Sequence, residues 1–155
     1  MRFLIGIGIL LGLTACGEDL NCEELTAFEA SAELGQGEQR FSAIGTQLEV
    51  HYGNQGGQHV FLAAQFTGLR IGNKRGSDAD DQPPQVNFRL SRDGETVSET
   101  FTFDRYPTGD SLDSQLVGVP LTVGYDESGE FTLTMEAVDS CGNLAVDERV
   151  VSLSY

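Results

Sequence analysis

Apolar and polar residues alternate along most of the chain, which is the pattern of β-strands with one buried face. Apolar side chains occupy the even positions from Leu48 to Tyr52 and again from Val60 to Phe66. Glycines crowd the segment 53–57 between these runs, so we predict a hairpin. If both apolar sets face the core, even positions lie opposite even positions, and His51 pairs with His59.

Further alternating segments follow the hairpin, and turn-forming residues separate them. The segments cover residues 86–90, 97–103, 116–123, 131–138 and 146–153, with turn sequences at 93–94, 126–129 and 139–143. No convincing helical period lies between them. We therefore predict an all-β fold, an antiparallel sandwich of about seven to eight strands with a core built from both sheets.

The segment before the hairpin has two interpretations. Apolar residues alternate over 28–34 as in an edge strand, whereas Asn21 followed by Glu24 is typical of a capped helix N-terminus. We favour the strand.

The first 15 residues are a different kind of segment. Arg2 precedes an eleven-residue apolar run, which is too short for a spanning helix of about 20 residues and predicts a secretory signal segment over 1–15. The residues Leu13-Thr14-Ala15-Cys16 resemble the lipobox of bacterial lipoproteins. The resemblance implies that Cys16 becomes the acylated N-terminus, that 16–27 is a lipidated acidic tether and 28–155 the sandwich domain. It favours the outer membrane as the location.

Cys22 and Cys141 are the two cysteines that remain. Exported proteins usually pair such residues, so we predict a disulfide, with free thiols or a metal pair as the alternatives. In a simple up-and-down order, an even number of strands would separate the two cysteines. The bridge therefore requires an odd number, with 41–44 as an extra or merged edge piece, or a Cys22 that reaches back along the domain.

The C-terminal segment carries a second resemblance. Residues 130–139, 142–145 and 150–153 resemble the closing hairpin of bacterial immunoglobulin-like or PKD-like modules. The whole chain is similar to small bacterial surface lipoproteins with one such domain. The resemblance implies an immunoglobulin-like strand order, which brings Cys22 near Cys141, and a role in adhesion, scaffolding or ligand display without catalysis.

The charge excludes one class of partner. The chain has 24 acidic and 9 basic residues and a formal charge of -15. Such a surface repels polyanions, so we exclude nucleic-acid binding.

One sequence motif suggests an enzyme. Gly109-Asp110-Ser111-Leu112 matches the nucleophile block of GDSL-type esterases. That chemistry needs a histidine to accept the serine proton, and both histidines of the chain precede Ser111. We interpret the segment as a polar loop.

Two groups of side chains are candidate metal ligands. His51 and His59, as cross-strand neighbours on the polar face, suit zinc or copper, although a solvated pair is the simpler interpretation. Six aspartates suit calcium if the loops that carry them gather at one end of the sandwich; solvated charge is the alternative. These aspartates are Asp78, Asp80, Asp81, Asp110, Asp113 and Asp139. We predict no resident cofactor, with calcium as the alternative.

The loop 72–85 is long for a compact domain, and binding residues concentrate in such loops. We predict that it contacts a partner through Lys74, Arg75, Asp78, Asp80 and Asp81. The predicted function is a lipid-anchored, non-catalytic binding, adhesion or scaffolding module of the cell envelope, with a protein or glycan partner. The alternative is an envelope hydrolase or metal-dependent enzyme, which needs a concave pocket with convergent titratable groups.

Overall fold

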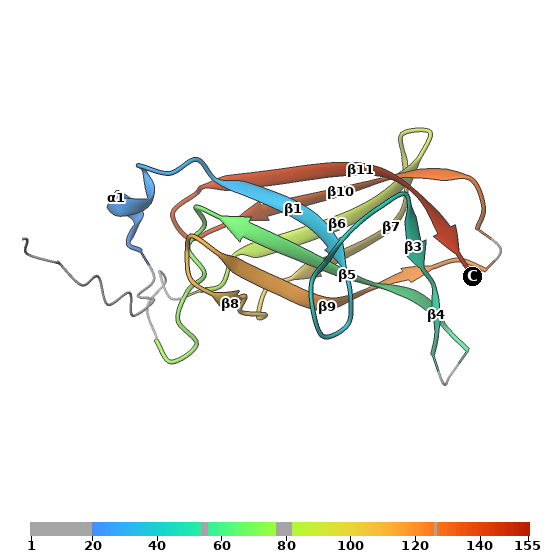
Figure 1. The fold of residues 1–155 in the computed structure, drawn as a ribbon, viewed down its shortest axis with the longest axis horizontal. Coiled ribbons are helices and arrows are strands. Elements are labelled where there is room, and N and C mark those ends of the chain that lie inside the picture. The colour runs from blue at the N-terminus through green and yellow to red at the C-terminus, as the bar shows by residue number, and fades with distance from the viewer. Residues whose placement is uncertain (1–19, 54–55, 77–81, 126) are drawn as a thin grey trace, which may run out of the picture.

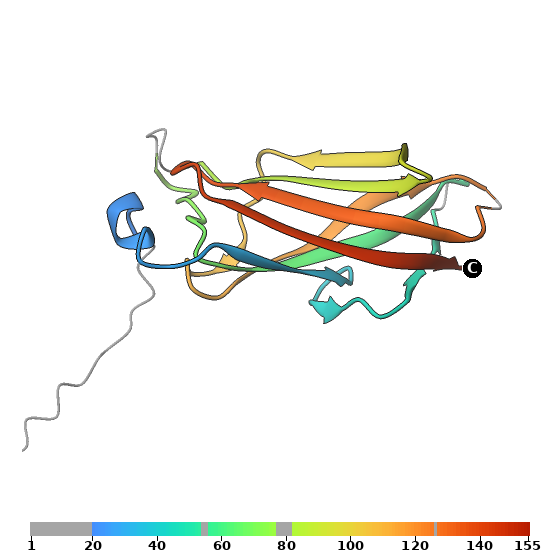
Figure 2. The same ribbon diagram turned by 90° about the horizontal axis from the view of Figure 1, so that it is seen from above.

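Two β-sheets packed face to face make up nearly the whole molecule (Figures 1 and 2). The computed structural model describes residues 20–53, 56–76, 82–125 and 127–155. The elements are α1 (Cys22–Leu25), β1 (Ser31–Gln36), β2 (Ser42–Ala43), β3 (Gln47–Glu49), β4 (His51–Tyr52), β5 (Gln58–Thr67), β6 (Gln85–Arg92), β7 (Glu95–Thr102), β8 (Thr108–Gly109), β9 (Ser114–Val123), β10 (Glu130–Val138) and β11 (Leu144–Ser154).

The strand order is that of an antiparallel immunoglobulin-like sandwich, as predicted. The first sheet has the order β2-β1-β5-β9-β8, with β4 also paired to β5, and the second has the order β3-β11-β10-β6-β7. Neighbouring strands are antiparallel except β3, which runs parallel to β11. In the described part of the chain, seven strands have six residues or more, and the other four are short.

The core lies between the sheets and comes from both of them. The alternating residues of β5, β6, β9 and β10 point inward, and Phe66, Phe88 and Phe131 are its largest members. Burial of these apolar faces is the main force that holds the sheets together.

The predicted strand 48–52 is divided between the two sheets. Leu48 lies in β3 of the second sheet, whereas His51 lies in β4 of the first. Both Leu48 and Val50 are buried, so the alternation is preserved although the chain changes sheets. A periodic pattern reports which side chains are inward and not which sheet the strand joins.

Both interpretations of the N-terminal segment are correct in part. Asn21 and Glu24 form a reciprocal capping box on α1, and the favoured strand begins later, at Ser31. The Cys22–Cys141 disulfide is present, with Cα atoms 5.3 Å apart. The predicted extra edge piece at 41–44 is the short strand β2, paired with β1.

The outward face of β7 departs from simple alternation. A core-facing apolar set would turn Val97 and Phe101 inward, yet they are 38% and 52% exposed, and Thr102 is buried instead. A β-bulge at Val97 sets this register. Ser91 pairs with Thr96 but Leu90 pairs with Ser98, so the extra residue shifts the rest of β7 by one position. Phe101 turns outward as a result. The consequence is an apolar outer surface on the second sheet.

Candidate functional site

The end of the sandwich beside α1 is a set of tied loops, which we call the α1 end. Gly68 N donates to Ser111 O at 2.7 Å, and Arg70 N donates to Asp139 Oδ2 at 2.8 Å. Leu20 N donates to the Ser111 Oγ at 3.2 Å. The loops that follow β5, β8 and β10 therefore lie together here, as the alternating topology predicts.

The carboxylates at this end have protein donors as partners. Asp139 is buried and accepts N–H bonds from Arg70, Cys141 and Asn143, with a further bond from the Asn143 side chain. Asp110 accepts from two N–H groups of its own turn, and Asp113 accepts from the Gln65 amide. These bonds stabilise the loops.

The metal hypotheses stay predictions. Asp78, Asp80 and Asp81 lie outside the described residues. Within the ranges that the structure describes, no group of three or more His, Cys, Asp or Glu side chains is placed to hold a metal ion.

Ser111 lies in the loop between β8 and β9, as we interpreted it. Its side chain is only 1% exposed, and its Oγ accepts the Leu20 N–H. The hydroxyl is directed into the protein and is not presented to a substrate.

The two histidines form the predicted cross-strand pair. His51 lies opposite His59 and Tyr52 opposite Gln58 in the β4–β5 register. The imidazole rings are stacked with centroids 6.2 Å apart, and Phe61 contacts both, at 5.2 Å from His51 and 4.7 Å from His59. Sequence analysis missed Phe61, although its position two residues after His59 places it on the same face.

An open groove of about 540 Å³ borders this ring cluster, and we call it the His51 groove. Amide, carboxylate, guanidinium and hydroxyl groups line it together with the His51 and Phe61 rings. Its residues are Gln36, Gly37, Glu38, Gln39, Arg40, Ser42, Glu49, His51 and Phe61.

Backbone constraints shape the groove. Gly37 has φ +139, and a Cβ there would lie 2.1 Å from Arg40 O, so the loop after β1 turns tightly only with glycine. The Gln36 side chain donates to Gln47 O and accepts from Glu49 N, which fastens β1 to β3 below the loop. The groove is thus lined by residues of five strands, β1 to β5, and by the loop after β1.

The predicted partner loop lies at the α1 end. Lys74 and Arg75 are exposed, and Lys74 borders a second open groove of about 540 Å³ together with Arg105, Tyr106 and Gln115. Asp104 also lines this groove, so the groove carries charges of both signs.

No protein-family model matches the sequence, and no curated protein matches it. Among the described residues, no helix is both long and apolar enough to cross a membrane.

Proposed function

We propose that this protein is a lipid-anchored, non-catalytic binding module of the bacterial cell envelope that presents the His51 groove to a neutral glycan. The anchor is the acylated Cys16 implied by the lipobox resemblance, and the outer membrane is the favoured location. The observation that carries the proposal is the position of the groove relative to the point where the N-terminal segment joins the domain.

The anchor would hold the α1 end against the bilayer. Leu20 is bonded to Ser111, and the disulfide fixes Cys22 to the turn after β10. Four peptide steps separate Cys16 from Leu20, so their Cα atoms are at most about 14 Å apart. A lipid on Cys16 therefore keeps the loops of the α1 end close to the membrane surface.

The His51 groove would then face away from the membrane. Phe61 and Gly68 are seven residues apart along β5, or about 23 Å at the rise of a strand. Gly68 lies at the α1 end, and Figure 1 shows β4 at the opposite end. Because the loop 72–85 begins on the anchored side, we now assign ligand binding to the groove in preference to that loop.

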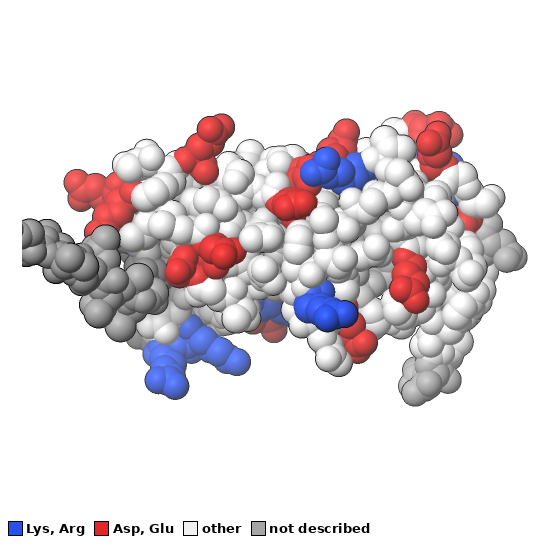
Figure 3. All heavy atoms as spheres, in the orientation of Figure 1, with Lys and Arg blue, Asp and Glu red and all other residues white. Residues whose placement is uncertain are grey.

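The lining suits a hydroxyl-rich ligand. Gln39, Arg40 and Ser42 supply hydrogen-bond donors and Glu38 supplies acceptors, while the Phe61 ring offers an apolar face to the C–H groups of a sugar. Acidic side chains are spread over the surface in Figure 3. The charge of -15 disfavours an acidic glycan.

The anchor is tested by mass spectrometry of the protein isolated from envelopes. We expect an acylated N-terminal Cys16 and membrane sedimentation, and we expect Cys16→Ser to release the domain from the membrane. A soluble product with an unmodified thiol would contradict the anchor.

The groove is tested separately by titrating neutral envelope oligosaccharides against the protein. We expect binding that falls about tenfold or more in Phe61→Ala, since a buried aromatic contact contributes more than about 1.4 kcal/mol. Phe28→Ala is the matched control, because Phe28 is 43% exposed and lies beside α1. Equal losses in both variants, or no binding by the unsubstituted chain, would refute the glycan assignment.

A further inference from the structure

The outer face of the second sheet carries most of the exposed apolar side chains. Twelve large apolar residues are exposed in the described part of the chain, and seven of them lie on this face. Single exposed apolar residues are normal on a protein surface, but a contiguous group marks an interface.

These residues form two columns along the strands. Leu144, Val146 and Val150 lie along β11, and Val97, Phe101 and the adjoining Phe103 lie along β7. The rings of Phe101 and Phe103 are stacked with centroids 5.9 Å apart. Val138 of β10 is paired with Leu144 and extends the first column.

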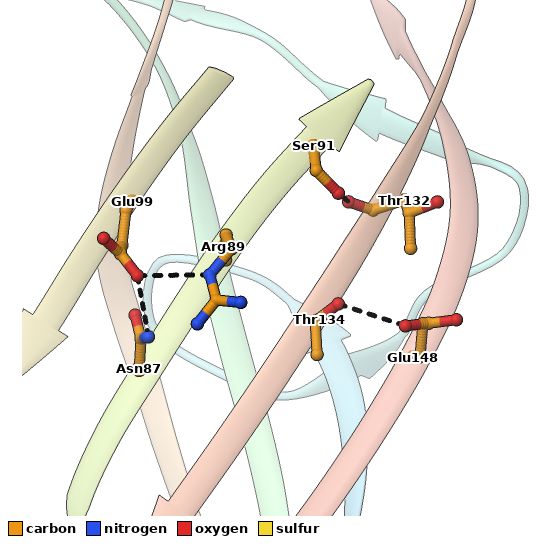
Figure 4. Close-up of polar contacts among 7 residues, drawn as sticks. All are labelled: Asn87, Arg89, Ser91, Glu99, Thr132, Thr134 and Glu148. Carbon is orange, nitrogen blue, oxygen red and sulfur yellow. Dashed lines mark hydrogen bonds and ion pairs between the residues drawn. The ribbon is translucent and has the colours of Figure 1, made fainter. Parts of the chain in front are cut away.

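The central strands β10 and β6 carry polar side chains that are already hydrogen bonded within the sheet. Figure 4 shows Glu99 accepting from Asn87 and Arg89, and Thr134 donating to Glu148. Ser91 donates to the Thr132 carbonyl. These groups keep their bonds when a second surface covers them, so the cost of covering them is the lost hydration of Arg89, Glu99 and Glu148.

We propose that this face binds the same face of a second copy of the chain. A two-fold axis parallel to the strands, between β10 and β6, exchanges β11 with β7. In that arrangement Val146 faces Phe101 and Leu144 faces Phe103, so each apolar column covers the other column of the second copy. In the same register Glu136 of one copy faces Asn87 of the other. Thr134 faces Arg89, and Glu148 faces Glu99, which is already paired with Arg89 of its own copy.

The area is adequate for a stable pair. Four strands about 4.8 Å apart and about nine residues long give a face of about 19 by 30 Å, or about 570 Å². If both faces are treated as flat, two copies together bury about 1,100 Å². This exceeds the roughly 1,000 Å² expected of a biological interface.

The net charge opposes this association, so the effect of salt on the pairing is a test of its physical basis. Two copies at -15 each repel one another, and added salt screens that repulsion while it leaves apolar contact intact. The pairing should therefore strengthen as salt rises. A contact based on charge attraction would weaken.

Cysteine cross-linking of the full chain in native membranes tests the pairing. Thr132 lies beside the proposed axis, so a short bis-maleimide should convert Thr132→Cys chains to covalent dimers, and more so in about 0.5 M sodium chloride. Thr122→Cys is the matched control, since Thr122 is exposed on β9 in the other sheet. The unsubstituted chain, treated alike, accounts for Cys16.

A second substitution separates apolar contact from charge. Val146→Lys, placed in the Thr132→Cys chain, lowers the negative charge but sets an ammonium group against Phe101, and we expect the dimer yield to fall about tenfold. Tyr125→Lys makes the same charge change off this face, at a residue that is 66% exposed, and should preserve the yield. Retention of the Cys22–Cys141 disulfide and of protease resistance shows that each variant is folded.

Four results would overturn the proposal. These are no dimer from Thr132→Cys, an equal dimer yield from Thr122→Cys, cross-linking of Thr132→Cys to a different protein, and an unchanged yield in folded Val146→Lys.

Discussion

Removing the Cys22–Cys141 bridge, by Cys22→Ser together with Cys141→Ser, should lower the free energy of unfolding by about 3 to 5 kcal/mol. The bridge closes a separation of 119 residues. For such a loop the chain-entropy estimate is about 4.9 kcal/mol at 25 °C. That value is a ceiling, because it applies only if α1 stays docked when the bridge is absent.

Detachment of α1 would reduce the loss. A folded domain with a frayed N-terminal segment regains conformational freedom, so its free energy falls relative to the docked form. Leu25 opposes fraying, since it is 0% exposed and its burial contributes about 1.5 to 3 kcal/mol. The capping box of Asn21 and Glu24 adds about 1 kcal/mol.

Guanidinium unfolding followed by circular dichroism measures the loss, since the chain has no tryptophan. Leu25→Ala provides the second arm of a double-mutant cycle. With the bridge intact it should cost about 2 to 5 kcal/mol. If α1 stays docked without the bridge, the cost should be similar there, whereas a frayed α1 makes the substitution neutral. A bridge contribution below about 1 kcal/mol with α1 still docked would refute the reasoning.

Three further measurements test individual side chains. Asp139→Ala should cost about 2 to 4 kcal/mol in denaturant unfolding and Asp139→Asn about 1 to 2, because the amide keeps one acceptor for the N–H donors; equal costs would contradict this account. Hydrogen bonds from Asn87, and to a lesser extent from Arg89, lower the pKa of Glu99 below 4.5. These bonds therefore stabilise the fold above the pKa of the unfolded chain, and the stabilisation is lost as pH falls through the lowered pKa of the folded chain. A carboxyl NMR titration should show a higher pKa of Glu99 in Asn87→Ala. Gly118→Ala should cost about 1 to 3 kcal/mol and weaken ligand binding in the His51 groove, because Gly118 has φ +68 and its Cβ would lie 2.5 Å from Glu38 O; an undisturbed groove would contradict that coupling.

The sequence alone was sufficient for features that depend on which residues of a strand face the core and on which cysteines are available to pair. The opposition of His51 and His59 follows from turn length and from the requirement that both apolar sets face the core. The disulfide follows from the number of cysteines and the predicted compartment. Neither prediction needs knowledge of the neighbouring sheet.

The His51 groove could not be predicted in the same way. Its rim is the loop after β1, whose shape depends on Gly37 and on the Gln36 contacts with β3, a strand in the other sheet. Such contacts have no period in the sequence. The sequence did contain one signal, Phe61, because an aromatic residue two positions after His59 lies on the same face of the strand.

The register of β7 argues that the apolar outer face is functional. A shift by one residue would bury Phe101 and expose Thr102, whose buried Oγ1 has no hydrogen-bond partner among the described residues. The chain instead keeps an unsatisfied hydroxyl inward and a phenylalanine outward, at a cost to the isolated domain of about 1 to 3 kcal/mol for the hydroxyl alone. A second surface over Phe101 would offset that cost. Thr102→Val should therefore stabilise the domain and leave the Thr132→Cys cross-link unchanged, because it removes the inward hydroxyl and keeps the outward phenylalanine.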